Sequence, residues 1–197
     1  MDDASPKPNL SNAAWVKIPT RLNACELFGI CTHIERLLRL NPYVHFEYWE
    51  QPGQNEIKAK WINHSNVEAF TVDTSLSVAY EEQEIKISYL SGIKTETYFI
   101  IEPSEQGATL AIVDNYSEDG EKKLSEVDKS LQTWGNALKR FFDHYIYLKK
   151  IPSIDIAIDR FWIRLSPMAR RVTYILLVIT AVEIVALLLF VLFMLLV

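Results

Sequence analysis

The sequence has few of the residues from which cross-linked or phosphate-binding sites are built. Its 197 residues include two cysteines and six glycines. Two thiols, Cys25 and Cys31, do not make a disulfide framework, so both are expected to be free. The sequence has no glycine-rich phosphate loop and no GxGxxG, GxSxG or HExxH motif. It therefore indicates none of the enzyme classes that these motifs identify.

An excess of basic residues is also missing. The chain has 20 Lys and Arg against 25 Asp and Glu, and residues 1–150 have a net charge of −6. Proteins that bind nucleic acid need a basic surface, so no nucleic-acid partner is expected. Residues 1–14 are polar and acidic, without the basic and apolar regions of a signal peptide. We expect them to be disordered.

Metal ligands are few and poorly spaced. The four histidines are scattered along the chain. Cys25, Cys31 and His33 are close in sequence, but Cys-x5-Cys-x-His is not a usual zinc spacing and a fourth ligand is not evident. We expect packed thiols here, with no metal and no cofactor.

The most informative feature that is present is the apolar run of residues 172–197. It spans 26 residues, of which only Thr173, Thr180 and Glu183 are not apolar. A helix of this length measures roughly 39 Å, more than the ~30 Å of hydrocarbon in a bilayer. A core helix of a soluble protein would need a polar face, and this run has none. It predicts a transmembrane helix, which makes the lipid bilayer a partner.

Basic residues just before this run predict its orientation. Arg160, Arg164, Arg170 and Arg171 give residues 151–171 a net charge of +2. Basic residues at a membrane end favour the cytoplasmic side, and they also suit anionic headgroups. The prediction is a single-pass, tail-anchored membrane protein with a cytoplasmic N-terminal body.

Residues 15–150 have the length and the apolar content of one folded domain. Hydrophobicity alternates with a period of two in six runs over residues 43–116, which predicts an antiparallel meander. A further strand is expected to begin at Trp15 and to stop at Pro19. A 3.6-residue period predicts a long amphipathic helix over residues 124–150. These elements together indicate an α+β fold.

Two short helices are predicted between the first strand and the meander. Asn23 is placed to cap the first helix, and Gly29 is placed to end it. Thr32 is placed to cap the second helix, with Glu35 completing a capping box.

The element order and two segments resemble a known superfamily. The first segment is ACELFGICTHIERLLRLNPYVHFEYWE, with Asn41 and Pro42 after the second helix, and the other is LQTWGNALKRFF. Both resemble the START-like or Bet v 1-like helix-grip proteins, the SRPBCC group, which includes polyketide cyclase-like and coenzyme Q-binding proteins. The resemblance covers residues 15–150 and implies a curved antiparallel sheet wrapped around the long helix.

That resemblance also implies a function. Helix-grip proteins hold sterols, lipids, quinones, polyketides or plant hormones between sheet and helix. Most of them lack a membrane anchor, so the anchor argues against a shuttle that diffuses between membranes. Candidates for lining a ligand cavity are the aromatic residues Trp61, Phe70, Tyr89, Tyr98, Trp134, Phe141, Phe142 and Tyr145. The alternative is that these side chains fill a solid core.

No catalytic residue is predicted. Asp114 lies near the end of the last strand, where a carboxylate could act as an acid or base on a bound ligand. The preferred interpretation is a polar strand end that leads into a turn.

Two membrane features remain. Residues 151–165 predict either a helix in the bilayer interface or a linker packed on the domain. In the first case the side chains at headgroup level are Trp162, Arg164, Arg170 and Arg171. Glu183 lies near the middle of the transmembrane run, where a charge is costly. We expect it to contact a membrane-protein partner or a second copy of the chain; the alternative is a lone protonated carboxyl group.

Three functions follow from these features. The preferred one is a membrane-tethered module that binds a hydrophobic small molecule such as a lipid, a sterol-like molecule or a quinone. The second is an accessory or assembly subunit of a membrane complex, which contacts its partners through the transmembrane helix. The third is a cyclase-like enzyme, for which the sequence offers no acid–base pair.

Overall fold

The computed structural model describes residues 13–66, 68–92, 94–117, 124–151 and 153–196. The expected disorder of residues 1–14 lies mostly outside these ranges. The elements are β1 (Ala13–Thr20), α1 (Ala24–Cys31), α2 (Ile34–Arg39), β2 (Val44–Glu50), β3 (Glu56–Asn63), β4 (Phe70–Tyr80), β5 (Glu84–Tyr89), β6 (Lys94–Ser104), β7 (Gly107–Tyr116), α3 (Leu124–Leu148), α4 (Ile154–Ala157), the π-helical turn η3 (Ile158–Trp162) and α5 (Pro167–Leu196).

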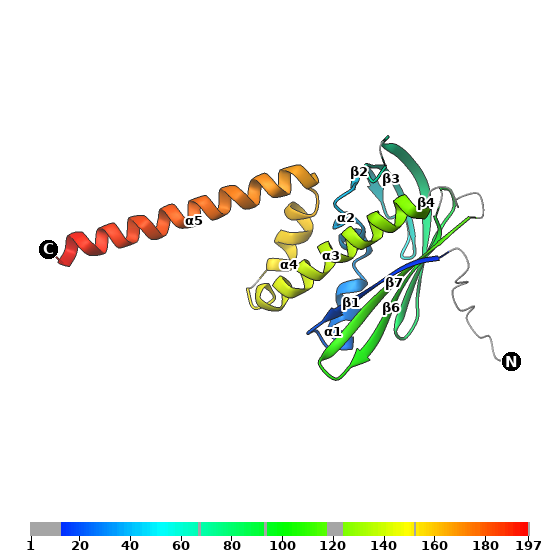
Figure 1. Cartoon of the computed structure of the whole chain (residues 1–197), viewed down its shortest axis with the longest axis horizontal. Coiled ribbons are helices and arrows are strands. Elements are labelled where there is room, and N and C mark those ends of the chain that lie inside the picture. The colour runs from blue at the N-terminus through cyan, green and yellow to red at the C-terminus, as the bar shows by residue number, and fades with distance from the viewer. Residues whose placement is uncertain (1–12, 67, 93, 118–123, 152, 197) are drawn as a thin grey trace.

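All seven strands form one antiparallel sheet, in the order β1-β7-β6-β5-β4-β3-β2. Strands β2 to β7 pair in sequence order, as short turns between alternating runs predict, and β1 closes the far edge by pairing with β7. Figure 1 shows the sheet curving around α3, with α1 and α2 beside that helix. The predicted α+β helix-grip fold is confirmed.

Helix α3 packs on the inner face of the sheet, the face turned toward the helices. Its buried side chains recur at three- and four-residue steps: Leu131, Trp134, Leu138 and Phe142. Gly135 lies beside this stripe, and a Cβ atom there would come within 2.9 Å of Val16 Cγ2. Glycine is therefore needed for the close approach of α3 to β1.

The local signals at α1, α2 and β1 are partly confirmed. Asn23 and Glu26 form a capping box, in which the Glu26 N–H donates to Asn23 Oδ1 at 2.8 Å. Helix α1 continues through Gly29, which has space around it, and ends at Cys31. The Thr32 hydroxyl donates to Gly29 O at 2.8 Å, so the predicted Thr32 capping box is wrong and α2 has no side-chain cap.

Strand β1 also differs from its prediction, because it runs through Pro19 to Thr20. Pro19 is paired in register with Thr109 of β7. Since β1 is an edge strand, its outward positions need no N–H for a further strand, and proline is tolerated there.

Helix α5 projects away from the body, with the C-terminal end of the chain beyond it (Figure 1). Within Met168–Leu196, an 18-residue window has a mean hydropathy of 3.1, and none of that window is buried. The helix is long and apolar enough to cross a membrane.

Candidate functional site

A cluster of polar side chains lies on the inner face of the sheet, where an apolar core is expected. Its centre is Asp114 of β7, whose side chain is fully buried. Thr97 Oγ1 donates to Asp114 Oδ1 at 2.5 Å, and Lys94 Nζ pairs with Asp114 Oδ2 at 2.5 Å. Tyr116 OH donates to the same Oδ2 at 3.2 Å, and Tyr89 OH lies 3.1 Å from Thr97 Oγ1. Three neighbouring strands, β5, β6 and β7, supply this inner polar cluster.

Strand alternation explains why Asp114 points inward. Leu110, Ile112, Asp114 and Tyr116 are alternate residues of β7, and all four are buried. The two-residue period of β7 thus indicates an inward Asp114 side chain, although the turn-like sequence after Asp114 suggests that the strand is ending. Asp114 does lie near the end of β7, but its side chain is buried on the inner face of the sheet.

Lys94 reaches the same face through an irregularity in β6. The register between β6 and β7 shifts between Lys94 and Glu96, so Lys94 lies opposite Tyr116 while Glu96 lies opposite Asn115. A β-bulge of this kind re-aims a side chain. The Lys94 ammonium lies 5.5 Å from the ring centroid of Trp134 on α3, so the cluster is next to the helix.

The hydrogen-bond directions leave spare donors in this cluster. Thr97 donates its only hydroxyl proton to Asp114, so it accepts from Tyr89. Burial and the charge of Asp114 raise the pKa of the Tyr89 hydroxyl, which therefore stays protonated. An ammonium carries three N–H donors, and the carboxylate of Asp114 takes one of those of Lys94. The cluster is therefore suited to a ligand that presents a hydrogen-bond acceptor.

The aromatic candidates fall into separate groups. Trp134 packs edge-on against Phe99, and its indole N–H donates to Leu37 O at 2.9 Å. Trp61 packs against Phe46 near β2, and Phe70 begins β4. Phe142 is fully buried and contacts Phe141. Of the eight candidates, the inner polar cluster brings together Tyr89 and Trp134.

Tyr98 lies on the opposite face of the sheet. Its neighbours Thr97 and Phe99 point inward, and its hydroxyl donates to Glu96 Oε2 at 2.8 Å. Lys86 lies over its ring. Tyr98 therefore does not face α3, although it is buried on the outer side.

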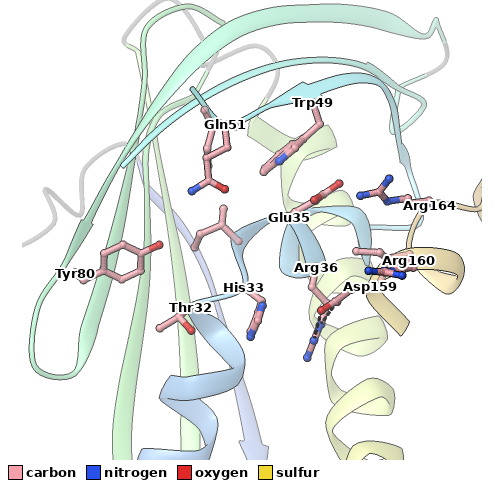
Figure 2. A pocket seen from close by; sticks show the side chains of 13 residues that line it. Thr32, His33, Glu35, Arg36, Trp49, Gln51, Tyr80, Asp159, Arg160 and Arg164 are labelled. Atoms are coloured by element: carbon pink, nitrogen blue, oxygen red, sulfur yellow. Dashed lines mark hydrogen bonds and ion pairs between the residues drawn. The ribbon is translucent and has the colours of Figure 1, made fainter. Parts of the chain in front are cut away.

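A second constellation joins the body to the segment before α5. The side chain of Arg36 on α2 is 1% exposed, and its Nε and Nη2 atoms donate to the two carboxylate oxygens of Asp159, both at 2.8 Å (Figure 2). Asp155 lies 3.4 Å away. The rings of Phe141 and Tyr145 lie about 6 Å from the guanidinium carbon. Burial disfavours the charged guanidinium, but Asp159 outweighs it and raises the pKa of Arg36.

These contacts place the segment of residues 153–166 against the domain. Ile158 and Ile163 are buried, Trp162 is half-buried, and Arg164 is exposed. The packed-linker interpretation accounts for Ile158 and Ile163, and the interface-helix interpretation stays a prediction. Phe161 is 70% exposed and remains available to a bilayer.

Arg170 connects α5 to α2 and to the segment of residues 153–166 through hydrogen bonds. Its guanidinium donates to Arg39 O at 2.7 Å and to Leu165 O at 3.1 Å. Arg171 is exposed, and so is Glu183 farther along α5.

Metal-ligating residues do not gather in the described ranges, where no group of three or more His, Cys, Asp or Glu side chains could hold an ion. Cys31 is buried in the core and Cys25 is exposed on the same helix.

Comparisons with known proteins show a similarity of fold and no similarity of sequence family. No family model and no curated protein matches the sequence. Among solved structures, the chain is similar to protein Ms6760 from Mycobacterium smegmatis, with a TM-score of 0.51, 9% identity, and coverage of 71% of this chain and 96% of that one. It is also similar to the di-domain ARO/CYC protein StfQ of the steffimycin biosynthetic pathway, with a TM-score of 0.50 and 10% identity.

The match to StfQ covers 69% of this chain and 52% of that one, so the chain spans about half of the di-domain protein. At these identities the likeness concerns the fold alone. The described part of the chain therefore has a helix-grip fold similar to those of these structures, followed by an apolar helix.

Proposed function

We propose that this protein is a membrane-tethered module that binds a hydrophobic small molecule between the inner face of its sheet and α3. The observation that carries the proposal is the inner polar cluster, in which a fully buried carboxylate is paired with Lys94 on the face of the sheet that packs against α3. The anchor would hold this site beside the bilayer, where hydrophobic molecules dissolve.

The energetic cost of the cluster supports a role in binding. Moving the Asp114 carboxylate fully out of water costs several kcal/mol, Lys94 keeps 25% of its side chain exposed, and apolar residues of similar volume often give equal or greater stability. Asp114 and Lys94 are thus poor choices for stability alone. Buried ionisable groups with specific partners are concentrated at functional sites.

The same cluster limits the class of ligand. Lys94 retains N–H donors beyond the one used by Asp114, and Trp134 and Tyr89 offer apolar surface beside it. This combination favours an apolar body with a carbonyl, hydroxyl or carboxylate oxygen at one end. Quinones, sterol-like molecules and acyl lipids all meet that description.

Organic extraction of the purified full-length chain, followed by mass spectrometry, tests the proposal. The test variant is Lys94→Met with Asp114→Asn, which removes both charges of the inner cluster. The matched control is Lys86→Met with Glu96→Gln, an ion pair at 2.6 Å on the outer side of the neighbouring strands. We expect one small molecule at fixed stoichiometry in the wild type and the control, and at least tenfold less in the test variant.

Two results would reject this function. One is a wild-type extract with no molecule beyond the bulk lipids that accompany any membrane protein. The other is equal retention by the Lys94/Asp114 variant, because the ligand would then not touch the inner polar cluster.

A second function has its own observation. Glu183 lies on α5, and no ion pair or hydrogen bond of its carboxylate occurs within the described residues. We propose that α5 associates with another membrane helix there, since an intramembrane carboxyl group is stabilised by a partner. Replacing Glu183 by leucine should then abolish a co-purifying partner or an oligomer in mild detergent. An unchanged complex would exclude this contact.

A further inference from the structure

A pocket of about 240 Å³ lies between the domain and the segment that leads into α5. Its walls are α2, the rim of strands β2 to β4, and η3 with the residues after it (Figure 2). We call it the juxtamembrane pocket. It is separate from the inner polar cluster, with which it shares no lining residue.

The charges that line the juxtamembrane pocket do not cancel. Glu35 is paired with Arg39 at 2.8 Å, and Asp159 is paired with Arg36. Arg160 and Arg164 have no ion pair or hydrogen bond to a side chain in the described part of the chain. After the internal pairs are formed, two guanidinium groups remain unmatched.

The two unmatched guanidinium groups lie on one side of the pocket. Arg160 belongs to η3, Arg164 belongs to the turn that follows it, and both line the pocket. Figure 2 shows both side chains reaching from that segment toward α2, with Trp49 and Gln51 across the pocket. Guanidinium forks bind phosphate oxygens in pairs, and two forks together can hold one phosphate group.

The connection to α5 keeps this pocket close to the membrane. Arg170, in the first turns of α5, donates to Arg39 O at the end of α2, and α2 supplies Glu35 and Arg36 to the pocket wall. The helix segment that is long and apolar enough to cross a membrane begins at Met168, four residues beyond Arg164. The pocket is thereby held near the level of lipid headgroups, where anionic groups are concentrated.

We propose that the juxtamembrane pocket binds the phosphate group of a phosphomonoester through Arg160 and Arg164. The phosphate is carried by an anionic lipid of the adjacent leaflet or by a soluble phosphoester, and the recognising chemistry is the same for both. Arg36 contributes positive potential, and its Nε and Nη2 atoms already donate to Asp159.

Titration by microscale thermophoresis tests this site in the full-length chain in a neutral detergent. The probes are dioctanoyl phosphatidic acid, dioctanoyl phosphatidylcholine and glycerol 3-phosphate. We expect phosphatidic acid to bind at least tenfold more tightly than phosphatidylcholine. The variant Arg160→Gln with Arg164→Gln should lose at least tenfold in affinity for the phosphate probe. A control with the same loss of charge, Arg140→Gln with Lys150→Gln, lies outside the pocket and should stay within twofold of wild type.

The probes also distinguish the two sources of phosphate. Phosphatidic acid binding tenfold more tightly than glycerol 3-phosphate assigns the site to a lipid, and equal binding assigns it to a soluble phosphoester. The proposal is overturned if neither phosphate probe binds, if phosphatidylcholine binds as tightly as phosphatidic acid, or if the Arg160/Arg164 variant and the control lose the same affinity. These outcomes do not depend on whether a ligand occupies the inner polar cluster.

Discussion

Replacing Asp155 and Asp159 by asparagine would leave the guanidinium of Arg36 buried without a counter-ion. That side chain is 1% exposed, and its guanidinium carbon lies about 6 Å from the ring centroids of Phe141 and Tyr145 on α3. Replacing Arg36 by methionine has a different consequence, because the two carboxylates left behind are 51% and 34% exposed and keep their contact with water. The double aspartate variant should therefore be the less stable of the two, although it keeps the arginine.

The expected losses in unfolding free energy follow from how deeply each charge is buried. An unpaired buried charge costs about 3–5 kcal/mol, and the lower end applies here because asparagine still offers an amide oxygen to the guanidinium. Arg36→Met removes the charge and keeps most of the packing volume, so it should cost about 1–2 kcal/mol. With a urea dependence of about 2 kcal/mol/M, a loss of 3 kcal/mol moves the unfolding midpoint by about 1.5 M.

Urea titration of the full-length chain in mild detergent, followed by tryptophan fluorescence, measures these midpoints. The control pair is Lys17 and Glu102, whose side chains are 53% and 48% exposed, and removing it should move the midpoint by less than about 0.5 M. The reasoning is refuted if the double aspartate variant shifts no more than this control. It is also refuted if Arg36→Met is the more damaging change.

Three further predictions use the same preparation. Gly135→Ala should lower the unfolding free energy by about 1 kcal/mol, because its Cβ would lie 2.9 Å from Val16 Cγ2. Gly29→Ala, where the space is open, should raise the unfolding free energy by up to about 1 kcal/mol. Equal urea midpoints for the two variants would contradict this prediction. N-ethylmaleimide at pH 7.5 should add one label, on exposed Cys25, because burial raises the pKa of Cys31 to about 12; a rapid second label detected by mass would disagree. Burial alone would raise the pKa of Glu96, but hydrogen bonds from Lys86 and Tyr98 outweigh burial and lower that pKa. The ionised Glu96 therefore stabilises the folded state above about pH 4.5, and this stabilisation is lost as the pH falls through the folded-state pKa. Glu96→Gln should then flatten the acid-side decline in urea midpoint between pH 5 and 3, and an unchanged decline would show that another group causes it.

The fold could be predicted because its signals are local. Alternation along β7 and the three- and four-residue spacing of buried side chains on α3 are both visible in the sequence. The meander also needs only short turns between strands that are neighbours in the chain. The two wrong predictions, the helix cap at Thr32 and the strand end at Pro19, concern the ends of elements. Where an element ends depends on its neighbours in the fold.

The site was harder to predict because its partners are distant in sequence. Arg36 and Asp159 are 123 residues apart, and nothing near either residue indicates the pair. Lys94 faces Asp114 because of a register shift in β6, which strict alternation does not anticipate. The position of Tyr98 could have been predicted, because alternation around Thr97 and Phe99 places it on the outer face. The strand has apolar residues on both faces, however, so the sequence does not show which face is the inner one.

A native mass spectrum of the wild-type full-length chain, released gently from detergent, tests the central claim most directly. The account predicts a species heavier than the polypeptide by one small molecule, at a stoichiometry that delipidation with detergent does not change. The Lys94→Met, Asp114→Asn variant should appear at the mass of the bare polypeptide. A wild-type chain that is bare under the same conditions, with the variant indistinguishable from it, would contradict the claim that the inner polar cluster binds a ligand.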